Sequence, residues 1–136
     1  MATEHSPAPA AHDLLPWVRW VAVLGAAGFV ILGLWAFLAP ASFFDTLATF
    51  EPYNVHFIRD IGAFQVGLGA VLLLVTLLPD ARAGALLGVG VGGALHAVGH
   101  VLDRDLGGSP ASDIPTFTLL TVVLIVAGLA QLRATR

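Results

Sequence analysis

The stretch "PYNVHFIRDIGAFQVGLGAVLLLVTLLPDARAGALLGVGVGGALHAVGHVLDRD", residues 52–105, contains two long apolar runs separated by a short turn. Each run has about the 20 residues that an α-helix needs to cross the hydrocarbon core of a bilayer. Pro79, in the turn "LPDAR", ends the first run because proline cannot continue a helix. The turn leaves little slack, so we expect helices at residues 56–78 and 81–102 that pack antiparallel against each other.

Two further membrane helices flank this pair. The first covers residues 17–39, with Trp17 and Trp20 at one end and Trp35 near the other, as expected for an interfacial aromatic belt. The last covers residues 113–132, with Asp113 placed to cap its N-terminus. Between the first two helices, "SFFDTLATF" at residues 42–50 has phenylalanines at helical spacing and predicts a short interfacial helix.

Composition supports this architecture. The chain is 57% hydrophobic and 11% charged, whereas soluble domains contain about 25% charged residues. We therefore expect an all-α, polytopic membrane four-helix bundle at residues 17–136, preceded by an Ala- and Pro-rich disordered tail at 1–16. The absence of cysteine excludes disulfides, thiol redox chemistry and iron–sulfur ligation, and the few basic residues are too dispersed for nucleic-acid binding.

The arginines predict the orientation of the bundle. Four spans place both termini on one side, together with Arg19, Arg82, Arg133 and Arg136. The opposite side holds only Arg59 and Arg104. Because cytoplasmic loops carry the excess of Lys and Arg, we expect both termini, including the tail, to be cytoplasmic.

Polar side chains mark the outer ends of the two middle helices. One helix begins with a polar group and the next ends with one, so antiparallel packing would gather both groups at the outer leaflet. The side chains concerned are His56, Arg59, Asp60, His96, His100 and Asp103. Within this set, His56 and Asp60 are four residues apart, as are His96 and His100, and such pairs share a helix face.

Imidazole and carboxylate ligands suit a divalent transition metal, held by His56, Asp60, His96, His100 and Asp103. An organic or haem cofactor would instead contact His56, Arg59, Asp60, His96 and His100. A haem iron with two axial histidines would need His56 on one side and His96 or His100 on the other. His96 and His100 share one helix face and cannot lie on opposite sides of the iron. A quinone would use histidine as its proton partner.

Three alternatives stay open beside a cofactor site. The polar groups could merely tie helix ends together, because ionisable groups in a membrane need partners. They could also line a path for protons or a solute. Finally, Gly84, Gly88 and Gly92 form a small-xxx-small face on the third helix. That face predicts a central place in the bundle for this helix, or contact with a second copy or another membrane protein.

Two segments, "YNVHFIRDIGAFQVGLG" (53–69) and "ALHAVGHVLD" (94–103), resemble uncharacterised DoxX-like small bacterial membrane proteins. The matching residues are Asn54, His56, Arg59, Asp60, Gly62, His96 and His100. The resemblance implies a four-helix bundle in the bacterial plasma membrane. Some DoxX-like relatives are linked to quinone-dependent oxidoreductases or redox stress, which implies an accessory of membrane redox chemistry here. The resemblance does not say whether the chain is itself an enzyme.

Overall fold

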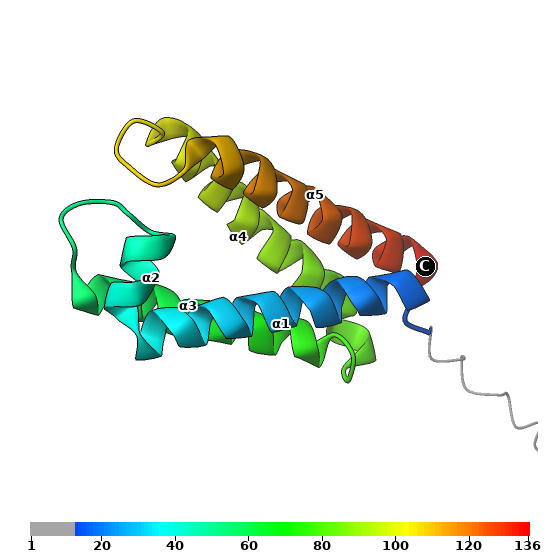
Figure 1. Ribbon diagram of the computed structural model, residues 1–136. Helices are drawn as coiled ribbons and strands as arrows, with labels where there is room; N and C mark the ends of the chain where they lie inside the picture. Colours follow the sequence, from blue (N-terminus) through cyan, green and yellow to red (C-terminus); the bar gives the residue numbers. More distant parts are fainter. Residues whose placement is uncertain (1–12) are drawn as a thin grey trace, which may run out of the picture.

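The computed structural model describes residues 13–136, and this part of the chain is helical with no β-strand. Its elements are α1 (Pro16–Leu38), α2 (Pro40–Thr46), α3 (Val55–Leu74), the 3-10 turn η1 (Pro79–Ala81), α4 (Arg82–Leu102) and α5 (Pro110–Ala134) (Figure 1). The four long helices, with η1 counted together with α4, are each long and apolar enough to cross a membrane. The predictions of an all-α fold, four candidate spans and a short helix in the first loop are confirmed. Of the predicted tail, residues 1–12 lie outside the described residues.

Three helices differ clearly from the predicted bounds. The helix α2 spans Pro40–Thr46 and ends before residue 50, so Phe50 lies in the loop that follows it. The helix α3 ends at Leu74, because beyond it the backbone changes to the shorter i to i−3 bonds, as from Leu77 N to Leu74 O (3.0 Å). The helix α5 begins at Pro110, so Asp113 lies inside its first turn and does not occupy the N-cap position, which is held by Ser109. Proline suits this first turn because the N–H it lacks would have no helical partner there.

The helices pair differently from the prediction. The helix α3 packs mainly along α1, and α4 mainly along α5, while α3 and α4 touch much less. The expectation that the two middle helices pack face to face is therefore wrong. The turn at 75–81 is short enough to bring α3 and α4 together, but helix pairing is decided by which faces allow the closest approach.

Glycines allow that approach at both interfaces. A Cβ added to Gly62 of α3 would lie 2.6 Å from the carbonyl oxygen of Gly33 of α1, so the two backbones are in direct contact. On α4, a Cβ at Gly90 would lie 2.8 Å from the Ile125 side chain of α5. The predicted face of Gly84, Gly88 and Gly92 has no neighbour within 4 Å. Within the described residues, no other helix covers the Gly84–Gly88–Gly92 face.

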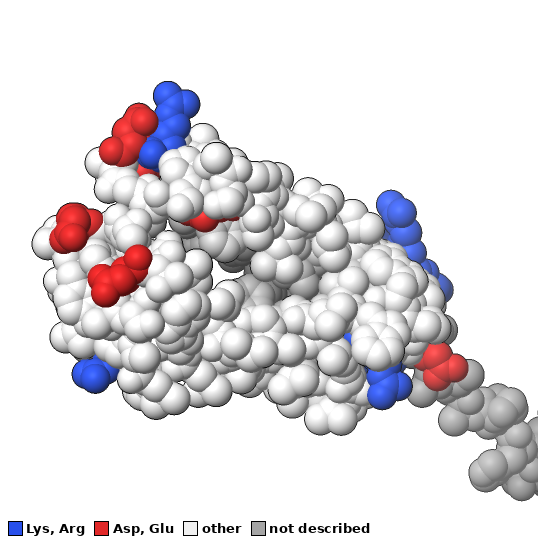
Figure 2. All heavy atoms as spheres, viewed as in Figure 1, with Lys and Arg blue, Asp and Glu red and all other residues white. Residues whose placement is uncertain are grey.

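The helices of the two pairs, α1 with α3 and α4 with α5, share a buried core at only one end. One core cluster draws on both pairs: Val18, Ala22, Ala26, Leu72, Val75, Leu86, Val89, Leu124 and Ala127. A second cluster, Ala36, Phe43, Phe44 and Ile58, belongs to α1, α2 and α3 alone. The pairs meet where the chain ends lie and diverge towards α2 (Figure 1), and the surface is hollowed between them (Figure 2). We call this space, between the α2-side halves of the two pairs, the inter-pair hollow.

Both ends of the described chain lie at the joined end of the bundle, which we call the terminal end. Gln131 is fully buried there, and its Oε1 accepts a hydrogen bond from Leu15 N (3.2 Å). The opposite end, called the α2 end, carries most of the acidic side chains visible in Figure 2. This arrangement agrees with four antiparallel spans, while the assignment of the termini to the cytoplasm remains a prediction.

Candidate functional site

His96 and His100 lie on one face of α4 near the α2 end, as their spacing predicted. Their ring centroids are 4.8 Å apart and the rings are inclined by 73°. Phe117 of α5 contacts both, with centroid distances of 4.5 Å to His96 and 4.7 Å to His100. The two imidazoles and the phenyl ring therefore form one aromatic group across the α4–α5 interface.

Asp113 completes this group from the first turn of α5. Its Oδ2 lies 3.8 Å from Nδ1 of His100, and the two side chains are only 19% and 16% exposed. The same oxygen accepts a hydrogen bond from Ser109 N (2.8 Å), and Oδ1 accepts one from Ser112 Oγ (3.2 Å). A carboxylate is also favoured at a helix N-terminus. These two hydrogen bonds therefore hold Asp113 in place beside His100.

Phe50, from the loop between α2 and α3, covers the group from the other helical pair. Its ring centroid is 5.8 Å from that of His100. Phe50 also forms an isolated antiparallel bridge with Gly107, in the turn between α4 and α5. Gly107 and Gly108 have φ of +146° and +71°, and a Cβ on Gly107 would overlap the Thr49 carbonyl oxygen, so only glycine suits this contact. We call Phe50, His96, His100, Asp113 and Phe117 the histidine cluster.

His96 faces the inter-pair hollow. It lies seven residues after Val89, and residues seven apart on an α-helix point within about 20° of each other. Val89 is buried in the core cluster shared by the two pairs, whereas His96, two turns nearer the α2 end, is exposed. The same face of α4 is therefore covered by the first pair at the terminal end and uncovered at His96.

The predicted pair of His56 and Asp60 also forms, but elsewhere. His56 Nε2 lies 3.4 Å from Asp60 Oδ2, and these side chains are 85% and 52% exposed. Arg59 beside them is exposed, as is Asp103 after the last turn of α4. The Asn54 side chain caps α3, accepting from His56 N (3.0 Å) and Phe57 N (3.2 Å). This end of α3 is thus an ordinary capped, solvated helix start.

The expected convergence of both polar groups on one site is not observed. Among residues 13–136, no three or more His, Asp or Glu side chains are grouped so that they could hold a metal ion. The reason is the pairing of α3 with α1 through Gly33 and Gly62, which leaves the start of α3 apart from the end of α4. Of the predicted residues, the structure brings together His96 and His100, and separately His56 and Asp60.

Sequence reasoning missed Asp113, Phe117 and Phe50 as members of the site. Asp113 was assigned only to capping, although four antiparallel spans place the start of the last helix beside the end of the third. A turn of seven residues between α4 and α5 leaves little distance between Asp113 and His100. Phe117, four residues after Asp113, then shares its face. The order of the helices and the spacing of four residues could therefore have predicted that Asp113 and Phe117 lie beside His100.

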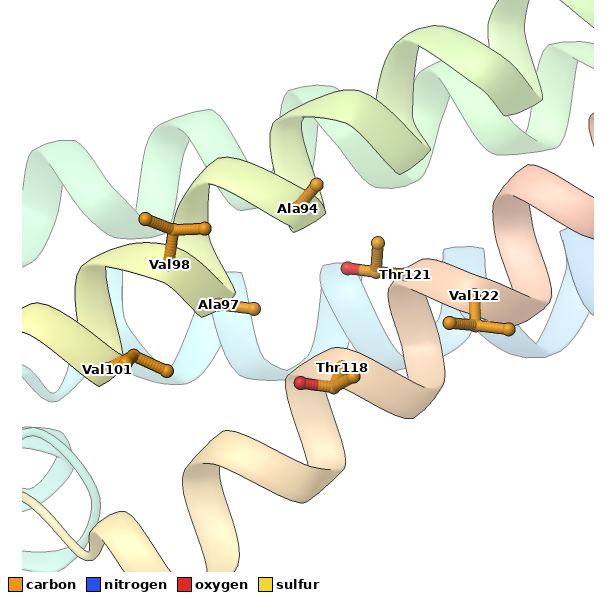
Figure 3. Close-up of a pocket in the computed structure, with 7 residues that line it drawn as sticks. All are labelled: Ala94, Ala97, Val98, Val101, Thr118, Thr121 and Val122. Atoms are coloured by element: carbon orange, nitrogen blue, oxygen red, sulfur yellow. The ribbon is translucent and has the colours of Figure 1, made fainter.

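A groove of about 230 Å³ lies on the other flank of the α4–α5 pair. Ala94, Ala97, Val98, Val101, Thr118, Thr121 and Val122 line it (Figure 3). Ala94 and Val98, which line the groove on α4, are each two residues from His96. Residues two apart on a helix point about 200° apart, so these side chains and His96 lie on different faces of α4. No titratable side chain lines it, so the groove offers no acid–base chemistry.

Comparison with known proteins adds no assignment: no protein-family model, no curated protein and no solved structure matches the chain. The resemblance to DoxX-like proteins therefore remains a prediction.

Proposed function

We propose that this chain is a multi-pass membrane protein that binds an organic redox cofactor of the quinone class at the histidine cluster, as an accessory of membrane redox chemistry. The observation that carries the proposal is the exposure of His96 to the inter-pair hollow, with His100, Phe117 and Asp113 packed behind it. Imidazole exchanges protons near neutral pH and hydrogen-bonds carbonyl and hydroxyl groups. Apolar pockets with a few placed polar groups are the usual form of small-molecule sites.

The cluster suits an organic cofactor better than a metal or haem. It offers two imidazoles and one carboxylate, and that carboxylate already accepts hydrogen bonds from Ser109 and Ser112. Haem with two axial histidines would need His56 opposite His96 or His100, whereas His56 pairs with Asp60 on the surface of α3. The aromatic face of Phe117 beside both imidazoles favours a planar ring as occupant.

Binding to the purified protein in detergent tests this proposal. The probe is decylubiquinone, and quenching of tryptophan fluorescence reports its Kd. We expect His96→Leu to weaken binding about tenfold, the effect of one lost hydrogen bond of about 1.4 kcal/mol. The matched control is His56→Leu, which changes an exposed histidine of α3 and should leave the Kd unchanged. Circular dichroism confirms that both variants keep their helices.

Three results would contradict the proposal. One is that the wild-type protein does not bind decylubiquinone, and another is that His96→Leu and His56→Leu weaken binding equally. A stoichiometric metal lost in His100→Ala would point instead to the metal site that the sequence predicted. If no ligand binds and the histidine variants alter only stability, the cluster serves to hold α4 and α5 together.

A second candidate function is that of a membrane interaction subunit. Gly84, Gly88 and Gly92 present an uncovered small-residue edge on α4, and such edges let another helix approach closely in lipid. Crosslinking of the protein in native membranes, compared between wild type and Gly88→Leu, tests this alternative. Loss of a specific crosslinked species in Gly88→Leu would support it, and an unchanged pattern would contradict it.

A further inference from the structure

The inter-pair hollow is bridged at the α2 end by loops of the two pairs. There the loop 47–54 of the first pair meets the turn 103–109 of the second, through the Phe50–Gly107 bridge and a hydrogen bond from Gly108 N to Thr49 O (3.4 Å). The Phe50 ring makes an edge contact with the His100 ring, with an interplanar angle of 82°. His100 and Asp113 are accordingly mostly buried, although they lie near the chain's most polar end. The loop contacts therefore lie between this part of the cluster and the water at the α2 end.

The hollow is closed at the terminal end. The core cluster shared by the two pairs fills the space between them with aliphatic side chains, of which Leu72, Leu86 and Leu124 are fully buried. Beyond these, Gln131 ties α5 to the start of α1 through its bond from Leu15 N. A ligand or proton carrier therefore cannot approach His96 from that end.

The sides of the hollow remain open. On α4, Gly92 and Gly99 lie on either side of His96 along the chain, and a Cβ at either would meet nothing within 4 Å. The helix α5 contacts α4 at Gly90 and Gly93. Gly92 and Gly99 lie on the edge of α4 that turns away from α5. Figure 2 shows the hollow opening on the flank of the molecule, in the middle of its white, uncharged surface. That flank would lie in the hydrocarbon if the four helices span a bilayer.

A second polar group borders the same space. Gln65 precedes Leu72 of the shared core by seven residues, so it points from α3 in nearly the same direction. Its Oε1 is buried and has no hydrogen-bond partner among the described residues. Buried side-chain oxygens nearly always have a partner, and each exception calls for a cause. A bound molecule with a hydroxyl or amide group would supply the missing donor.

We infer that the histidine cluster is reached laterally, through the bilayer, between the α2-side halves of the two helical pairs, and that its ligand is a membrane-dissolved molecule. This inference rests on the proposed function for the use of the site, but the route itself depends only on the shape of the protein. A water-soluble ligand would have to displace Phe50 and the Gly107 contact. A lipid-soluble ligand meets no side chain at the glycine edge of α4.

Cysteine accessibility tests the route without any ligand. The chain has no cysteine, so a single introduced thiol is the only site of reaction. His96→Cys is reconstituted into vesicles and treated either with N-ethylmaleimide, which partitions into lipid, or with a charged, membrane-impermeant maleimide. Val98→Cys, at nearly the same depth on the outer flank of α4, is the lipid-exposed control. Asp105→Cys, whose side chain is 87% exposed in the turn, is the water-exposed control.

We expect His96→Cys to behave like Val98→Cys, reacting slowly with N-ethylmaleimide, because a thiol ionises little in apolar surroundings, and not with the impermeant reagent from either side. Adding Phe50→Ala should make His96→Cys react several-fold faster with the impermeant reagent, because the cap at the α2 end is removed. Reaction of His96→Cys with the impermeant reagent as fast as Asp105→Cys would overturn the inference. So would protection from both reagents while Val98→Cys reacts.

The two proposals fail separately. If decylubiquinone does not bind but the labelling pattern is as expected, the lateral route stands and the proposed cofactor is wrong. If decylubiquinone binds through His96 but the thiol is reached from water, the site stands and the route is wrong.

Discussion

The contact between α1 and α3 allows a quantitative test at Gly62. A Cβ placed there would lie 2.6 Å from Gly33 O and 2.7 Å from Phe37 N, and both are backbone atoms that no rotamer change can move. An ordinary contact begins near 3.4 Å, so Gly62→Ala requires the two helices to separate by about 0.8 Å. A gap of 0.5–1 Å forfeits roughly a quarter to a half of each dispersion contact along the interface.

Overpacking of this kind costs about 1–3 kcal/mol, and we expect Gly62→Ala to lose that amount of unfolding free energy. The matched control is Gly67→Ala on the same helix, where a Cβ meets nothing within 4 Å. Alanine is a better helix former than glycine, so the control should be neutral or up to about 1 kcal/mol more stable.

Unfolding in mixed micelles by titration with sodium dodecyl sulfate measures both variants. All three tryptophans of the chain, Trp17, Trp20 and Trp35, lie on α1, so their fluorescence reports the separation of α1 from its neighbours. Circular dichroism followed in the same titration reports helix content. Equal stability of Gly62→Ala and Gly67→Ala would refute the close backbone contact, and with it the pairing of α1 with α3.

Three further predictions concern polar contacts. Asn54→Ala should lower the unfolding free energy by about 1 kcal/mol through loss of the α3 cap, while Asn54→Asp, which can still accept from His56 N, should change it little in the same titration. Gln131→Leu should cost about 1–3 kcal/mol because it leaves the N–H of Leu15 without its partner, and amide hydrogen exchange at Leu15 should accelerate; unchanged exchange would contradict this. Asp60→Asn should shift stability by less than about 0.5 kcal/mol, because its pair with His56 is largely exposed and screened by water and salt; a larger loss in the titration would show a role beyond the surface pair.

Several features followed from sequence alone because they depend on local physics. Apolar runs of membrane-spanning length predicted the four long helices, and Pro40 correctly marked the end of the first. The spacing of four residues correctly predicted that His96 would lie beside His100, and His56 beside Asp60. These contacts lie within one helix, so helix geometry alone determines them.

Only the tertiary structure decided which helices pair and hence which polar groups meet. Glycines lie on more than one face of α4, and their order along the chain does not show that Gly90 and Gly93 contact α5 while Gly84, Gly88 and Gly92 stay uncovered. That choice depends on close packing between surfaces distant in sequence. It placed Asp113 beside His100, left His56 apart on α3, and opened the space that His96 faces.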